Sequence, residues 1–119
     1  MTSSSADDLL IEFKWYGGDK TVSQKTFLDE FVKRDLNNIE SFNNLQWRIK
    51  GQKLTKDKMI EYLSSNEGRQ MLKNIPAEKA NKILGRDDLR GITELQRNKI
   101  AEAIIEHFNN QSNFNSVFK

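Results

Sequence analysis

Two stretches of this 119-residue chain alternate apolar with polar side chains, and they constrain the fold most. The first stretch runs from Leu9 to Tyr16 and the second from Leu45 to Lys50. Alternation with period two, rich in aromatic and β-branched residues, predicts strands with one buried face. The residues expected on the buried face of the first strand are Leu9, Ile11, Phe13 and Trp15, and those of the second are Leu45, Trp47 and Ile49.

The first strand is followed by Gly17-Gly18, a pair typical of hairpin turns because glycine tolerates positive φ. We therefore expect Lys20–Ser23 to form a short antiparallel return strand. A Gly-Gly pair can also cradle phosphate, but that site needs more glycines and a lysine in register.

Helical periodicity accounts for most of the remaining chain. Ser23 or Thr26 is expected to cap a helix whose apolar face has the i, i+4 pairs Phe27/Phe31 and Leu28/Val32. After Gly51 the pattern predicts about four short helices, the last over about 94–108. The residues expected to start these helices are Thr55, Ser64 with Glu67, Pro76, and Thr93 with Gln96. Gly85 is the expected C-terminal cap of one of them.

The expected fold class is α+β, with a small N-terminal β-hairpin–helix–strand unit covered by about four C-terminal helices. Over residues 9–54, including the stretch Leu45–Leu54, this order loosely resembles the start of a ubiquitin-like β-grasp fold. After Leu54 only helices are predicted, so the resemblance is architectural. The expected organisation is a flexible leader (1–8), a single α+β domain (9–108) and a polar flexible tail (109–119). Alternatively, Phe114, Val117 and Phe118 form a short apolar peptide that docks on the domain or on a partner.

Composition limits the chemistry. The chain has no cysteine, which excludes disulfides and thiolate metal sites, and it has one histidine, His107. We expect His107 to be a structural residue at a helix end, and the pairs Asp7-Asp8 and Asp87-Asp88 to be solvated charge. No catalytic residue, metal or cofactor is predicted, and the chain is not expected to be an enzyme.

The net charge of +2 conceals an uneven distribution. Residues 1–47 sum to −3, residues 48–99 to +6 and residues 100–119 to −1. The candidate contacts for a partner or for nucleic acid are Arg48, Lys50, Lys53, Lys56 and Lys58. Trp15, Tyr16 and Trp47 would stack on bases if exposed, but Trp15 and Trp47 lie on the apolar sides of their strands and are expected in the core.

From these features we expect a non-enzymatic intracellular (cytoplasmic or nuclear) adaptor or regulatory domain. It would bind a protein partner through its helical half, or form a homodimer. The alternative is a nucleic-acid-binding domain that uses the basic strand-turn ridge at residues 48–58. No membrane association is expected, because no stretch approaches the ~20 apolar residues of a spanning helix.

Overall fold

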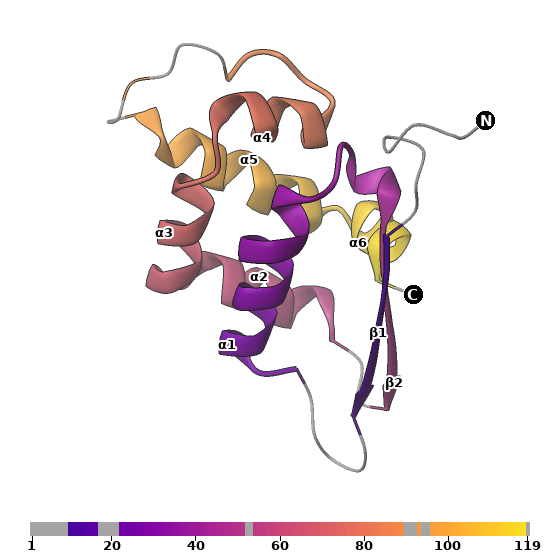
Figure 1. Ribbon diagram of the computed structural model, residues 1–119. Coiled ribbons are helices and arrows are strands. Elements are labelled where there is room, and N and C mark those ends of the chain that lie inside the picture. Colours follow the sequence, from indigo (N-terminus) through magenta and orange to yellow (C-terminus); the bar gives the residue numbers. More distant parts are fainter. Residues whose placement is uncertain (1–9, 17–21, 52–53, 90–92, 94–95, 119) are drawn as a thin grey trace, which may run out of the picture.

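The computed structural model describes residues 10–16, 22–51, 54–89, 93 and 96–118, and it shows helices packed on one face of a small sheet (Figure 1). The N-terminal half comprises β1 (Leu10–Tyr16), α1 (Gln24–Phe27), the π-helical η2 (Leu28–Arg34), the 3-10 segments η3 (Asp35–Asn37) and η4 (Phe42–Asn44), and β2 (Leu45–Gly51). The C-terminal half comprises α2 (Lys56–Ser64), α3 (Asn66–Lys73), α4 (Ala77–Leu84), α5 (Asn98–Asn109) and α6 (Gln111–Val117). The predicted mixed α and β composition is confirmed.

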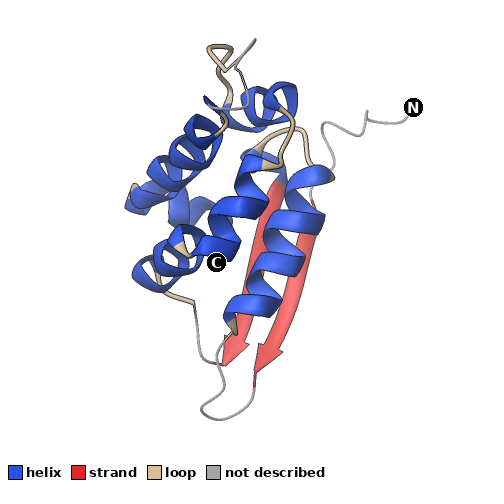
Figure 2. Cartoon of the chain, turned by 90° about the vertical axis from the view of Figure 1, so that its left-hand side faces the viewer, coloured by secondary structure: helices blue, strands red, loops and turns tan. Residues whose placement is uncertain are grey.

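The two strands run parallel, side by side (Figure 2). Leu10 pairs with Leu45 and Tyr16 with Gly51, so the whole of β1 is in register with β2. Parallel neighbours need a long crossover, and the helical segment from Gln24 to Asn37 provides it. The sheet of the described residues is therefore a β–helix–β unit.

The predicted hairpin is not found in the described residues. Gly17, Gly18 and Lys20 lie outside them, but Val22 and Ser23 are described and belong to no strand. Ser23 instead caps the crossover helix, because its hydroxyl accepts a hydrogen bond from the Thr26 amide at 3.2 Å. Val22 is buried, and its carbonyl accepts from the Tyr62 hydroxyl at 2.8 Å. Val22 and Ser23, the last two residues of the predicted return strand, therefore make these contacts with helices and not with β1.

The parallel register also reverses the predicted face of β1. The buried residues Leu45, Trp47 and Ile49 are in register with positions 10, 12 and 14, and Leu10 packs against the core. Phe13 is paired with the exposed Arg48 and has 74% of its surface exposed. Phe13, which was predicted to face the core, therefore lies on the outer face of the sheet. Leu9 and the side chain of Trp15, predicted on the same stripe, lie outside what the structure describes.

The predicted helices after Gly51 are present, with two changes. Ser65, and not Ser64, caps α3, accepting from the Gly68 amide at 3.0 Å. Gly68 allows α2 and α3 to approach closely, since a Cβ there would lie 2.3 Å from the Tyr62 carbonyl oxygen. Gly85 ends α4 with φ 68°, the left-handed conformation that a glycine cap adopts without strain.

The second change is an additional helix in the segment expected to be a flexible tail. Residues 111–117 form α6, and Phe114, Val117 and Phe118 are buried. The physical reason is their i, i+3, i+4 spacing, which puts three apolar side chains on one helical face. The Asn110 side chain caps the helix by accepting from the amides of Ser112 and Asn113. The alternative expectation, that these apolar residues dock on the domain, is the one the structure shows.

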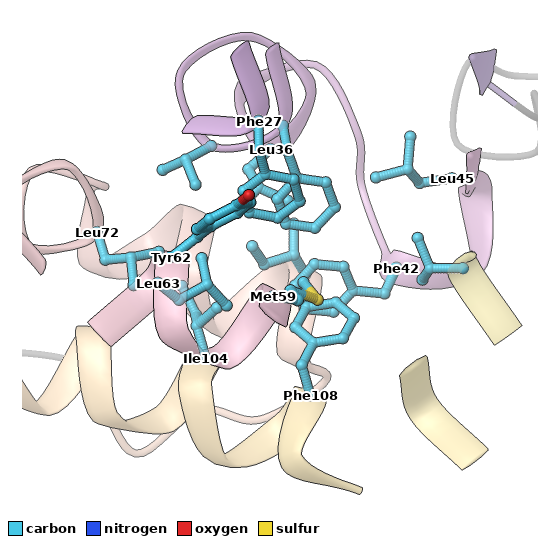
Figure 3. Packing of buried hydrophobic residues seen from close by; sticks show 14 of the residues in the cluster. Phe27, Leu36, Phe42, Leu45, Met59, Tyr62, Leu63, Leu72, Ile104 and Phe108 are labelled. Carbon is cyan, nitrogen blue, oxygen red and sulfur yellow. The ribbon is translucent and has the colours of Figure 1, made fainter. Parts of the chain in front are cut away.

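Aromatic side chains cluster in the core, and Figure 3 shows Phe27, Phe42, Tyr62 and Phe108 among the buried residues. Phe27 and Phe31 stack with ring centroids 4.9 Å apart, and both meet the edge of Trp47 at 5.8 Å. Phe118 reaches the same cluster from the C-terminus, 5.8 Å from Trp47, and its backbone forms a bridge with Trp47. The prediction that Trp47 is a core residue is confirmed.

Candidate binding surfaces

Of the five basic residues predicted as contacts, the structure describes the side chains of three, one on β2 and two on α2. Arg48 projects from the outer face of β2, where its guanidinium donates to Gln46 Oε1 at 3.2 and 3.0 Å. Lys56 and Lys58 lie in the first turn of α2. The side chain of Lys50 and the whole of Lys53 lie outside the described residues. The basic ridge at residues 48–58 therefore stays a prediction, because the turn that would join its two ends lies outside the described residues.

The two lysines of α2 differ in their freedom to bind a ligand. Lys56 Nζ donates to Asn109 Oδ1 at 3.3 Å, and only 22% of its side chain is exposed. Lys58 Nζ pairs with Glu61 Oε2 at 3.3 Å and lies 5.7 Å from the centroid of the Tyr62 ring. Exposed pairs of this kind contribute little energy, so Lys58 can exchange Glu61 for another anion at small cost.

A hollow of 320 Å³ lies between η2–η3 of the N-terminal half and the end of α3 in the helical C-terminal half. We call it the α3 groove. Its lining residues are Val32, Lys33, Asn37, Met71, Asn74 and Ile75. Val32 and Ile75 are buried and Met71 is half-buried, whereas Lys33, Asn37 and Asn74 are exposed. An apolar floor with a polar rim is the usual composition of a site for a protein side chain.

A second hollow of 460 Å³ is lined by Glu78, Asn81, Lys82 and Arg86. Its cations are already paired, since Lys82 Nζ lies 2.9 Å from Glu40 Oε2 and Arg86 binds both carboxylate oxygens of Asp88. The Arg86 hydrogen bonds lower the pKa of Asp88 to about 2. Asp88 is thus an exposed, paired carboxylate. Asp7 and Asp8, the other predicted acidic pair, lie outside the described residues.

His107 lies near the end of α5, as predicted, and its ring stacks on Phe42 with centroids 4.7 Å apart. Among the described residues, Phe108 is a second aromatic neighbour, at 4.8 Å. Burial lowers the pKa of His107 below its ordinary value of 6.5. The neutral imidazole is therefore the form that the fold favours.

This pKa shift predicts a pH dependence of stability. The folded state binds fewer protons than the unfolded state as the pH falls through 6.5, so the free energy of unfolding should fall from about pH 7.5 to about pH 5.5. The His107→Gln variant should lose this dependence, because the chain has one histidine. Urea denaturation at several pH values measures it. An equal slope in both proteins would contradict the assignment to His107.

The sequence did not lead us to predict that Asp35 is a buried, hydrogen-bonded carboxylate. Its Oδ2 accepts from Trp47 Nε1 at 2.7 Å and its Oδ1 accepts from Arg34 Nε at 3.0 Å. The available signal was its spacing, because Asp35 follows Phe27 and Phe31 at i+8 and i+4 on the apolar face of the crossover helix. Both oxygens are hydrogen-bonded, so Asp35 fixes Trp47 between the helix and the sheet.

Comparison of the chain with protein-family models, with curated proteins and with solved structures found no match. Among the described residues, no group of three or more histidine and acidic side chains is placed to hold a metal ion. No helix in the described part of the chain is both long and apolar enough to cross a bilayer. The surfaces above are therefore interpreted from their own geometry.

Proposed function

We propose that this protein is a non-enzymatic adaptor or regulatory domain that binds a protein partner through its helical half. The observation that supports this proposal is the α3 groove, where two buried apolar residues and Met71 meet an exposed polar rim. Methionine adapts its shape to different apolar surfaces. The groove suits one or two apolar side chains of a partner helix, with an acidic residue facing Lys33.

The contacts of the one histidine and of the buried carboxylate Asp35 support the non-enzymatic part of the proposal. His107 is packed against Phe42 and Phe108, and both oxygens of Asp35 are hydrogen-bonded to the domain itself. A general base needs a free lone pair near a substrate. An intracellular location, cytoplasmic or nuclear, belongs to the same proposal, since a chain without cysteine suits a reducing compartment.

The test compares two matched variants of the full chain. Met71→Glu places a charge in the α3 groove, and Leu84→Glu makes the same kind of change at a half-buried residue of α4 outside it. Partners recovered by tagged wild-type chain are identified and titrated calorimetrically. We expect Met71→Glu to weaken binding at least about tenfold and Leu84→Glu to leave it unchanged. Equal affinities, or no stoichiometric partner, would contradict the proposal.

The alternative function is nucleic-acid binding by the basic segment, and the exposure of Arg48 and Lys58 favours it. Its test is a titration with duplex DNA and with single-stranded RNA at two salt concentrations. Binding that weakens steeply with salt, and that is lost in Arg48→Glu with Lys58→Glu, would support this alternative. Absence of binding at low salt would reject it.

A further inference from the structure

The far edge of β1 is open in the described part of the chain. The sheet has the order β1–β2, and the opposite edge of β2 is met by Phe118 through its bridge with Trp47. No described strand pairs with the other side of β1. A seven-residue strand without proline, with Phe13 exposed beside that edge, is a template for pairing with another strand.

The sequence of β1 indicates which strand would pair with it. Charges on an edge strand ordinarily oppose pairing, but the two charges of β1, Glu12 and Lys14, have opposite signs and flank Phe13 symmetrically. In an antiparallel pair of two β1 strands centred on Phe13, each Glu12 is opposite Lys14 of the second copy. The same register puts Phe13 opposite Phe13, and Ile11 opposite Trp15.

We propose that two copies of this chain form a symmetric dimer through antiparallel pairing of their β1 strands. The twofold axis passes between the two Phe13 residues, and the product is a continuous four-stranded sheet of order β2–β1–β1–β2. Such an interface is isologous, because each contact occurs twice. The opposite-charge pairs and the facing aromatic residues are the cross-strand pairs that stabilise antiparallel sheets.

The dimer should depend on concentration. One strand pair buries less than the roughly 1,200–2,000 Å² of a standard stable interface, so we expect a dissociation constant on the order of tens of micromolar. Sedimentation equilibrium should then show a mass that rises from 13.9 kDa toward twice that value. A monomer throughout the millimolar range, or an oligomer larger than a dimer, would overturn the proposal. If β1 pairs only with a strand of a different protein, the purified chain stays a monomer, and that result also overturns the proposal.

The absence of natural cysteine allows a direct test of the axis. In the proposed dimer the two Phe13 Cα atoms lie about 4.5–5.5 Å apart, within disulfide range. Arg48 is the matched control, because it is exposed on the same face in register with Phe13. Three strand spacings separate the two Arg48 residues by about 14 Å, too far for a disulfide. Under mild oxidation Phe13→Cys should cross-link and Arg48→Cys should not. Equal cross-linking would contradict edge pairing, and would be expected if the sheets stacked face to face.

Charge exchange tests the register. Glu12→Lys and Lys14→Glu each place like charges opposite one another twice, so each variant alone should dimerise at least about tenfold more weakly. Mixing the two variants restores opposite charges at both sites, and the mixture should form a heterodimer. The double variant Glu12→Lys with Lys14→Glu should dimerise like the wild type, which controls for misfolding. Failure of both the mixture and the double variant to recover dimerisation would overturn the register.

Discussion

Replacing Trp47 with alanine should lower the free energy of unfolding by about 3–5 kcal/mol, the usual cost of a large-to-small change at a buried aromatic residue. Trp47 is 0% exposed, and its ring contacts those of Phe27, Phe31 and Phe118. These rings belong to the crossover helix and to the C-terminus, so the cavity would open where the sheet, that helix and the chain end meet. Urea denaturation followed by circular dichroism measures the loss.

A second variant separates the packing of Trp47 from its hydrogen bond. Trp47→Phe keeps an aromatic ring but removes the indole N–H that donates to the buried Asp35 carboxylate. The expected cost is about 1–3 kcal/mol, since a buried acceptor loses a donor. An unchanged unfolding midpoint in Trp47→Ala would contradict the burial of Trp47. The alternative prediction, that an exposed Trp47 stacks on bases, would then be supported.

Replacing Phe118 with alanine should also cost about 3–5 kcal/mol, although Phe118 is the penultimate residue of the chain. Its ring stacks on Phe114 at 4.8 Å and lies 5.5 Å from Phe31, so it joins α6 to the aromatic cluster. Thermal and urea unfolding of the Phe118→Ala variant of the 119-residue chain measure this effect.

The matched control for Phe118→Ala is Asn115→Ala, a substitution at an exposed position of α6. It should change stability by no more than about 0.5 kcal/mol. Equal unfolding midpoints for wild type and Phe118→Ala would show that residues 109–119 form the flexible tail expected from their composition.

The helices of the C-terminal half were predictable because their signals are local. Thr55 caps α2 by accepting from the Lys58 amide at 3.1 Å, and Gly85 ends α4, as their sequence positions indicate. α6 was missed because polar residues dominate residues 109–119, and local composition does not reveal that Phe118 can reach Trp47. Spacing was the better guide there than composition.

The sheet was only half predictable for a different reason. Alternation identifies the residues that share a face of a strand, but it does not determine which face is covered. In β2 the apolar face is the buried one, whereas in β1 the parallel register turns Phe13 outward. The α3 groove was not predictable either, since Val32 and Met71 lie 39 positions apart in the sequence and meet only through packing of η2 on α3.

The parallel pairing of β1 with β2 is the central claim, because the outward Phe13 and the open edge both follow from it. Backbone nuclear Overhauser effects in isotope-labelled protein, recorded at low concentration, test it most directly. We predict contacts across the strands at the paired positions Glu12 with Trp47 and Lys14 with Ile49. Contacts between β1 and residues 20–23 in the antiparallel pattern of a hairpin, without contacts to β2, would contradict it.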